Sequence, residues 1–356
     1  MNLKNKFLKQ KSLLRPFVYS RPSVSSIVIR ILILLLIQIF MLFFTDSFQS
    51  LKIVGLSVLG AFCAAILNYF IFKEPLYNIF YMIIQGIIIG LFLPSSYPVF
   101  IVFIISFITI FVSRCVIFQN ITSWFNPCAV AVVIAWFIGK TYFPQFIITS
   151  DLLSVKNPSV YLIQEGVFPI YNFDRAIISF LNTKVFSLLK TSVPEGILSI
   201  LWDNQSVIPA FRFNLITLFS SIIIFSDKAF SSVIPFLFLS VYILLVRFFA
   251  PIFYGGNFNQ GDILLALFSS GTIFGAVYLF QTFGTVPMTL FGKIIYGILA
   301  GIIYFLLAGC GTSPIAMVYT VLIMNIINIM IKAIEEYKNK LKIIKANPQI
   351  VKEATV

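Results

Sequence analysis

Long apolar runs, separated by shorter polar stretches, dominate the pattern of this chain. The runs are roughly 15–20 residues long, about the length that a helix needs to cross ~30 Å of hydrocarbon. The pattern predicts ten membrane-spanning helices, at about residues 27–45, 53–72, 78–93, 98–115, 127–143, 212–226, 232–249, 262–281, 290–308 and 314–331. The predicted fold class is therefore an all-α polytopic membrane protein.

The longest polar stretch separates the fifth run from the sixth. Its opposite charges nearly cancel, and they are Asp151, Glu165, Asp174, Glu195 and Asp203 against Lys156, Arg175, Lys184 and Lys190. We interpret it as a small external cap of short helices, because residues 174–191 have apolar positions at helical spacing. The predicted organisation is a basic N-terminus (1–26), a five-helix half (27–143), an extracytoplasmic segment (144–211), a second five-helix half (212–331) and a basic tail (332–356).

Composition agrees with this pattern, since 60% of the residues are hydrophobic and only 10% are charged. The formal net charge of +13 suggests nucleic acid at first sight, but the positions of the charges argue against it. Basic residues gather before the first run and after the last, at Lys4, Lys6, Lys9, Lys11, Arg15, Arg21, Lys338, Lys340, Lys342, Lys345 and Lys352. Lysine and arginine mark cytoplasmic flanks, so we expect both termini to be cytoplasmic in a multi-pass protein of the cell inner membrane. Anionic membrane lipid is a sufficient partner for these lysines, and we expect no nucleic acid.

The two predicted halves share short patterns. The third run contains "GIIIG" (86–90) and the eighth contains "GTIFG" (271–275). The fifth run opens with "NPCAV" (126–130) and the tenth with "SPIAM" (313–317). Small residues four apart and a proline in the first helical turn thus recur in corresponding runs. We therefore predict two inverted five-helix halves.

Several kinds of chemistry are excluded by residue type. The chain has no histidine, and its four cysteines show no CxxC spacing. A haem histidine ligand, a zinc–histidine site and a serine–histidine nucleophile are therefore excluded, and we predict no metal site and no catalytic residues. No Asp or Glu lies deep within a run, so the chain lacks the usual element of a carboxylate-driven ion relay.

The eighth run, "GDILLALFSSGTIFGAVYLF" (261–280), contains the first candidate site. Gly271 and Gly275, flanked by Ser269, Ser270 and Ala276, form a stripe of small residues along one face, and Thr272 is a further candidate beside it. Such a stripe allows either close packing of another helix or the approach of a flat ligand, in a pocket or ion path. Asp262, at the start of the run, is expected to cap the helix N-terminus.

Two asparagine-containing segments supply the remaining candidates. Asn126 and Pro127 in "SWFNPCAV" predict a helix that begins abruptly, with N–H groups that either face a ligand or form a plain cap. Asn325 and Asn328 lie three apart on one face of the tenth run. Amides at that depth either bond another helix or line a path.

Five segments spread along nearly the whole chain match one known pattern, namely "NIFYMIIQGIIIGLFLPSS" (78–96), "FNPCA" (125–129), "GDILLALFSSGTIFGAVYLF" (261–280), "FGKIIYGILAGIIYFLL" (291–307) and "AMVYTVLIMNIINIMIK" (316–332). In these segments the chain resembles the family that comprises the D subunit of the Rnf complex and the related B subunit of sodium-translocating NADH:quinone oxidoreductase. The resemblance implies an inner-membrane subunit that carries flavin and helps to couple electron transfer to ion movement.

The resemblance also implies an FMN phosphoester on a threonine of the external segment, in a Ser-x-Ala-Thr motif. The similar stretch here is "NTKVFSLLKT" (182–191), which places Lys184 at the threonine position, with Thr183 adjacent. Two further family elements are also absent, since this chain has "QSVIPAFRF" (205–213) and "LFQTFGTVP" (279–287) instead. We therefore expect no covalent FMN, which leaves only non-covalent binding of FMN or riboflavin. Lys184 is either a phosphate partner or a solvated charge.

Two functions follow from the sequence. The first is a subunit of an ion-translocating electron transport complex, acting as scaffold and ion-path component without covalent FMN. Such a chain is a non-catalytic part of an oxidoreductase and requires partner subunits of an Rnf-like complex. The alternative is a stand-alone permease for a small planar molecule such as riboflavin.

Overall fold

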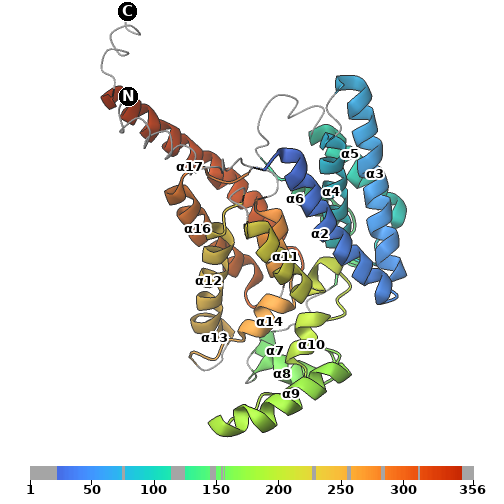
Figure 1. Cartoon of the computed structure of the whole chain (residues 1–356), viewed down its shortest axis with the longest axis vertical. Helices are drawn as coiled ribbons and strands as arrows, with labels where there is room; N and C mark the ends of the chain where they lie inside the picture. The colour runs from blue at the N-terminus through green and yellow to red at the C-terminus, as the bar shows by residue number, and fades with distance from the viewer. Residues whose placement is uncertain are drawn as a thin grey trace, which may run out of the picture.

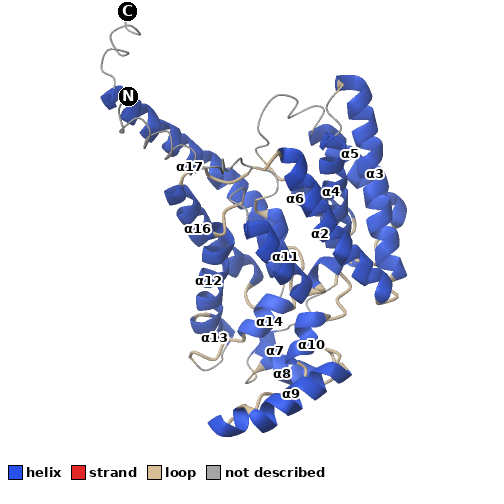
Figure 2. Cartoon of the chain, viewed as in Figure 1, coloured by secondary structure: helices blue, strands red, loops and turns tan. Residues whose placement is uncertain are grey.

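The computed structural model describes residues 22–73, 77–113, 125–144, 150–153, 155, 157–226, 230–254, 258–281, 285–311 and 313–346. These residues form helices and connecting loops, with no strand among them (Figure 2). The all-α fold class predicted from the sequence is therefore confirmed.

The first five apolar runs form one group of helices. They are α2 (Val24–Phe44), α3 (Phe48–Phe72), α4 (Tyr77–Phe92), α5 (Val99–Phe111) and α6 (Pro127–Ile138). Helix α6 ends earlier than the run predicted, because Gly139 follows it and leads into the short 3₁₀ turn η2 (Lys140–Tyr142). Each of the five helices otherwise follows the run predicted for it.

The second group follows the sixth, seventh, ninth and tenth runs as α11 (Asn214–Ser226), α12 (Val233–Phe248), α16 (Leu290–Ala308) and α17 (Ala316–Ala346), with a short α13 (Ala250–Tyr254) after α12. Four helices are long and apolar enough to cross a membrane, namely α2, α3, α16 and the Ala316–Leu341 part of α17. Five shorter apolar helices of 10–17 residues accompany them in the described part of the chain.

The eighth run differs from its prediction as one continuous helix. It is divided into α14 (Ile263–Phe268), α15 (Thr272–Phe274) and a π-helical turn, η5 (Gly275–Leu279). At the break, the hydroxyls of Ser269 and Ser270 donate hydrogen bonds back to the carbonyls of Leu265 (2.6 Å) and Ala266 (3.1 Å). The Leu265 carbonyl also keeps its backbone bond from the Ser269 N–H (3.0 Å), whereas the Ala266 carbonyl accepts from side-chain hydroxyls, so the helix can stop inside the protein.

Between the two groups, the chain forms six short elements, in the stretch 144–211 that the sequence predicts to be external and that is called the external segment below. They are α7 (Ser150–Leu153), α8 (Pro158–Gln164), α9 (Asn172–Lys184), η3 (Phe186–Leu189), α10 (Ile197–Trp202) and η4 (Pro209–Phe211). Most of them lie together at one end of the molecule, where Figure 1 shows them in green. Asp174 holds α9 against α10, because its buried carboxylate accepts from the Gly196 N–H (3.0 Å), the Ser199 N–H (2.7 Å) and the Ser199 hydroxyl (2.8 Å).

Small residues set the packing within both groups. In the first, α3 packs against α4 and α5, and a Cβ at Gly60 would lie 2.6 Å from the Phe103 carbonyl of α5. In the second, α16 packs against α12, and a Cβ at Gly301 would lie 2.9 Å from the Phe238 carbonyl. The second and fourth runs thus pair in one group as the seventh and ninth do in the other. The inverted relation between the halves stays a prediction.

Candidate functional site

Buried polar side chains form three clusters along the segment from α14 to η5. The first cluster surrounds Arg212 and Asp203, the second lies at the break after α14, and the third lies beyond η5, where α6 and α17 meet. We name them the ion-pair cluster, the hydroxyl cluster and the amide cluster.

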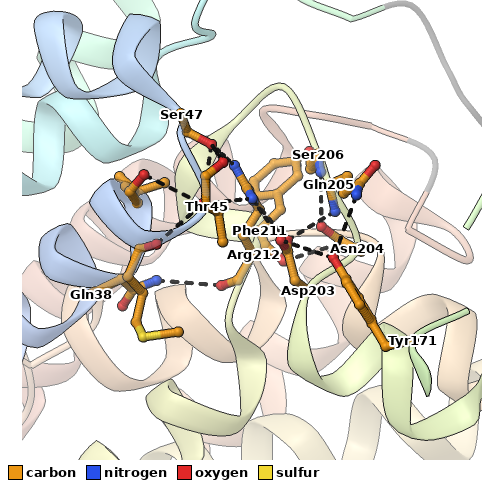
Figure 3. Close-up of polar contacts among 12 residues, drawn as sticks. Gln38, Thr45, Ser47, Tyr171, Asp203, Asn204, Gln205, Ser206, Phe211 and Arg212 are labelled. Atoms are coloured by element: carbon orange, nitrogen blue, oxygen red, sulfur yellow. Dashed lines mark hydrogen bonds and ion pairs between the residues drawn. The ribbon is translucent and has the colours of Figure 1, made fainter. Parts of the chain in front are cut away.

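The ion-pair cluster is built around two charges buried in the protein (Figure 3). Arg212 donates to both carboxylate oxygens of Asp203, through Nε (2.7 Å) and Nη2 (2.6 Å). The side chains of Arg212 and Asp203 are 8% and 1% exposed. The guanidinium also donates to the hydroxyls of Ser47 (2.7 Å) and Thr45 (3.2 Å), at the end of α2. One side chain thus ties the external segment to the first group of helices.

Tyr171 extends this cluster into the external segment. Its hydroxyl donates to the Asp203 carboxylate at 3.4 Å and accepts from the Gln205 amide at 3.4 Å. Burial raises the pKa of Tyr171 above its ordinary value of 10.0, and the nearby Asp203 charge adds to this effect. Tyr171 therefore stays protonated, as a hydrogen-bond donor, through the neutral range.

Two asparagines connect the start of α11 to the break. The side-chain amides of Asn204 and Asn214 both donate to the Phe268 carbonyl, at 2.8 and 3.0 Å. Both also donate to the Phe211 carbonyl, each at 3.1 Å. Phe268 is the last residue of α14, so these amides satisfy a carbonyl exposed by the interruption of the helix.

The hydroxyl cluster lies on the other side of the break. Thr272 is within 2.6 Å of the Ser270 hydroxyl and 2.7 Å of the Tyr304 hydroxyl, and Ser270 and Tyr304 are 3.1 Å apart. The Ala266 carbonyl accepts from both Ser270 and Thr272. Tyr304 comes from α16, so this cluster joins the interrupted segment to a neighbouring helix.

The amide cluster begins with Asn126, which is fully buried. Its side-chain oxygen accepts from the N–H groups of Cys128 (2.9 Å) and Ala129 (3.4 Å), and its amide nitrogen donates to the Leu279 carbonyl at the end of η5 (2.9 Å). The sequence predicted that the N–H groups at the start of α6 either face a ligand or form a plain cap. Two of them donate to the Asn126 side chain, which caps the helix. Pro127 fills the first helical position and donates nothing.

Asn325 of α17 completes the contact between the two groups of helices. Its amide oxygen accepts from the Asn126 N–H (2.8 Å), and its nitrogen donates to Thr285 Oγ1 (3.3 Å) and the Val321 carbonyl (3.2 Å). One turn along α17, Asn328 donates to the Thr285 carbonyl at 2.8 Å. Asn126 and Asn325, both candidates from the sequence, therefore meet directly.

The glycine stripe is filled by side chains of the same chain. A Cβ at Gly271 would lie 2.7 Å from the Phe211 ring, and a Cβ at Gly275 would overlap the Met317 side chain. Thr272 belongs instead to the hydroxyl cluster. This geometry supports close packing at the two glycines.

Asp262 is an N-cap, as predicted. Its carboxylate accepts from the Leu265 N–H (3.0 Å) in the first turn of α14. It also accepts from the Ser159 N–H (2.7 Å) at the start of α8, so it joins the external segment to the interrupted segment. Glu335 of α17 makes similar contacts beside the start of α16. Its carboxylate accepts from the Thr289 N–H (3.2 Å) and from the Thr289 hydroxyl.

Thr183 and Lys184 lie apart from the three clusters, in the last turn of α9. Both are exposed, and the Thr183 hydroxyl donates to the carbonyls of Ser179 (2.9 Å) and Phe180 (3.0 Å) in its own helix. Lys184 places a positive charge at a helix C-terminus, where the helix dipole favours it. Thr282, in the stretch "LFQTFGTVP" that differs from the family pattern, lies outside the described residues.

Sequence reasoning missed the pairing of Arg212 with Asp203 and the role of Tyr304. Arg212 lies at the predicted start of the sixth run, where such side chains commonly reach water. The available signal was that Asp203 and Arg212 have opposite charges on either side of the apolar stretch 207–211. Tyr304 gave no signal, because tyrosines are common in apolar helices.

The hydroxyl and amide clusters share one chemical property, which is that their side chains are neutral. Their oxygens and amides can bind water, a partly dehydrated cation or a neutral ligand, but they cannot relay a proton by titrating near neutral pH. Among the described residues, no three His, Cys, Asp or Glu side chains gather to hold a metal ion.

Helices of this length, with polar clusters buried between two groups, define a multi-pass membrane protein. The sequence model of the NQR2, RnfD, RnfE family matches residues 12–340, and the chain belongs to this family. The resemblance found in the sequence is thereby confirmed, and the family consists of membrane subunits of Rnf- and Nqr-type electron transport complexes. A search among curated proteins found no match to the chain.

Proposed function

We propose that this chain is the scaffold and ion-path component of an ion-translocating electron transport complex of the Rnf or Nqr type. In this role, it holds partner subunits, and the interrupted segment from α14 to η5 provides neutral polar groups inside the membrane. We also propose that it lies in the cell inner membrane with both termini in the cytoplasm, as the flanking lysines indicate.

The observation that carries this proposal is the placement of the three clusters along one broken helix. Interrupted helices occur within membranes where they line a cavity or pathway, because exposed backbone groups need polar partners there. Here the Phe268 carbonyl accepts from Asn204 and Asn214, and the Leu279 carbonyl accepts from Asn126 at the start of α6. The Ala266 carbonyl accepts from Thr272 of the interrupted segment itself. A cation crossing at this boundary would meet neutral oxygens in place of carboxylates.

We further propose that no FMN is covalently attached. A phosphoester requires a free hydroxyl in the family position, and that position is occupied by Lys184. The neighbouring Thr183 hydroxyl is already engaged with two carbonyls of α9. Any FMN or riboflavin would therefore bind non-covalently. The permease alternative receives no support at the glycine stripe, because Phe211 and Met317 fill the space.

Purification of the tagged full-length chain from native membranes in mild detergent tests this function. We expect NADH- or ferredoxin-linked redox subunits to co-purify, and the denatured chain to show its unmodified mass and no flavin fluorescence. Ion uptake by vesicles containing the complex should fall in Asn325→Leu without loss of the co-purifying subunits. Riboflavin uptake by vesicles that contain only this chain would favour the permease instead.

A further inference from the structure

The last helix, α17, carries exposed apolar and aromatic side chains along one face. Six of them recur at spacings of three or four residues, with exposed fractions from 37% to 66%, and they are Ile323, Ile326, Met330, Ile334, Tyr337 and Leu341. Positions with this spacing share one face of a helix. One apolar stripe therefore runs along α17 as far as Leu341.

The stripe continues past the point where charged residues begin. The segment from Ala316 to Ile331 contains no charge, whereas Lys332, Glu335, Glu336, Lys338 and Lys340 follow it. A helix of 31 residues is about 46 Å long, against ~30 Å of hydrocarbon, so its last turns lie at or beyond the membrane surface. Figure 1 shows these turns continuing past the start of α16 and away from the other helices.

Glu335 holds these last turns against α16. Its carboxylate accepts from the N–H groups of Met288 (3.3 Å) and Thr289 (3.2 Å) and from the Thr289 hydroxyl. The negative charge of Glu335 is therefore directed at the start of α16, where the helix dipole favours it. This contact fixes the rotation of α17 about its axis, and so it fixes the direction in which the stripe faces.

Lysine and aromatic side chains lie together beside the end of the stripe. The Lys338 ammonium lies 5.2 Å from the centroid of the Phe291 ring, which belongs to the first turn of α16 and is 63% exposed. Lys338 and Lys340 are both exposed, and in the sequence they lie between Tyr337 and Leu341 of the stripe. Apolar and aromatic side chains with lysines at their edge are typical of helix surfaces that lie at a membrane–water interface.

We propose that this end of α17 binds the surface of an anionic membrane. The binding surface, which we name the α17 surface, consists of Phe291, Ile334, Tyr337, Lys338, Lys340 and Leu341. Its apolar side chains enter the boundary between headgroups and acyl chains, and its two ammonium groups pair with lipid phosphates.

Two observations favour lipid over a protein partner at the α17 surface. The stripe is continuous with the exposed face of the span, which lies in the hydrocarbon, and the exposed charges between Tyr337 and Leu341 are both positive. The cytoplasmic orientation proposed above places this surface at the leaflet with the negative surface potential. The inference rests on the proposed function only in that respect.

Quenching of tryptophan fluorescence by brominated lipid tests this contact. The full-length chain with Tyr337→Trp is reconstituted into phosphatidylcholine vesicles that contain a small fraction of brominated lipid, and the emission of the wild type, which has three tryptophans, is subtracted. Asn339→Trp is the matched control, because Asn339 is also exposed but lies two positions further, on the opposite side of the helix. We expect the new tryptophan of Tyr337→Trp to be quenched about twofold more, or stronger still, than that of Asn339→Trp.

The headgroup preference is measured on the same Tyr337→Trp chain. Brominated phosphatidylglycerol should quench it more strongly than brominated phosphatidylcholine, and this difference should shrink at about 1 M salt. Adding Lys338→Gln and Lys340→Gln should lower the preference for the anionic lipid by about fivefold per lysine. Lys52→Gln with Lys190→Gln is the control, because it removes the same charge from exposed positions elsewhere, and it should leave the preference unchanged.

Equal quenching of Tyr337→Trp and Asn339→Trp would overturn the inference, because the stripe would then face water or protein. Equal quenching of Tyr337→Trp by the two brominated lipids would overturn it as well, because the lysines would then select no anionic headgroup. The comparison of the two lipids needs no lysine substitution, so a misfolded lysine variant does not obscure the result. Co-purification of redox subunits tests the proposed function separately, and its failure would leave this inference standing.

Discussion

Arg212 and Asp203 form a buried, two-point ion pair that joins the external segment to the first group of helices. Two nitrogens of the guanidinium bond two oxygens of the carboxylate, at 2.7 and 2.6 Å. The same guanidinium reaches Ser47 and Thr45 at the end of α2. Two parts of the chain that are distant in sequence, the end of α2 and the stretch from Asp203 to Arg212, therefore depend on one side chain.

Asp203→Asn should destabilise the protein strongly. The substitution leaves the Arg212 charge buried without a counter-charge, which typically costs about 3–5 kcal/mol. The measurement is the midpoint of thermal or SDS-induced unfolding of the purified chain. Glu195→Gln is the control, because Glu195 pairs with Arg175 at 3.6 Å with both side chains at least half exposed, and it should cost at most about 1 kcal/mol. Equal losses in the two variants would contradict the role assigned to the buried pair.

Asn126→Ala should destabilise the contact between the two groups of helices. It removes the N-cap of α6, worth about 0.5–2 kcal/mol, and it leaves the buried Leu279 carbonyl without a donor, which costs a further ~1–3 kcal/mol. Ser23→Ala is the matched variant, because Ser23 caps α2 through one exposed bond to the Ser26 N–H. Ser23→Ala should lose only the stability that the N-cap contributes. The same unfolding measurement compares them, and a loss in Asn126→Ala no larger than that in Ser23→Ala would count against the amide cluster.

Two glycines of α3 should respond oppositely to alanine. Gly60→Ala places a methyl group against the Phe103 backbone carbonyl, which cannot move without shifting α5, so it should lower the melting temperature. At Gly55, nothing lies within 4 Å of an added Cβ, so Gly55→Ala should raise stability by about 0.5–1 kcal/mol through helix propensity. If both substitutions were neutral, the close packing of α3 on α5 would be wrong.

Alkaline pH should weaken the external segment through Tyr171. Its pKa is raised in the folded protein by burial, so above its ordinary value of 10.0 the unfolded chain loses the proton first. The stability present below pH 10 is therefore lost as the pH rises towards the folded pKa. The melting temperature of the wild type should fall more steeply between about pH 9.5 and 11 than that of Tyr171→Phe. Parallel curves would show that Tyr171 does not titrate differently on unfolding.

Local signals in the sequence were sufficient for several features of the site. Asn126 followed by Pro127 predicted an abrupt helix start, and α6 begins at Pro127 with an Asn126 cap. Asp262 at the mouth of the eighth run predicted a cap, and it caps α14. Both predictions succeed because capping depends on residues two or three positions apart. The partner of Asn126 could not be predicted in this way, because Asn325 lies on the last helix.

The break in the eighth run could not be predicted from local signals in the sequence. Ser269, Ser270 and Gly271 are tolerated in membrane helices as packing residues, so their presence does not predict where a helix stops. The interruption is stabilised by Asn204, Asn214 and Tyr304, which come from the external segment, α11 and α16. Only the folded arrangement brings these partners together.

The sequence by itself determined the all-helical fold, the number and order of the apolar segments and the family. Hydrophobic length and short-range capping act along the chain, and they are therefore visible in it. Tertiary structure alone decided that Arg212 pairs with Asp203, that Phe211 and Met317 fill the glycine stripe, and that Asn126 meets Asn325. Hydrogen bonding and packing inside a membrane protein depend on which helices are neighbours, and that choice is made by the whole fold.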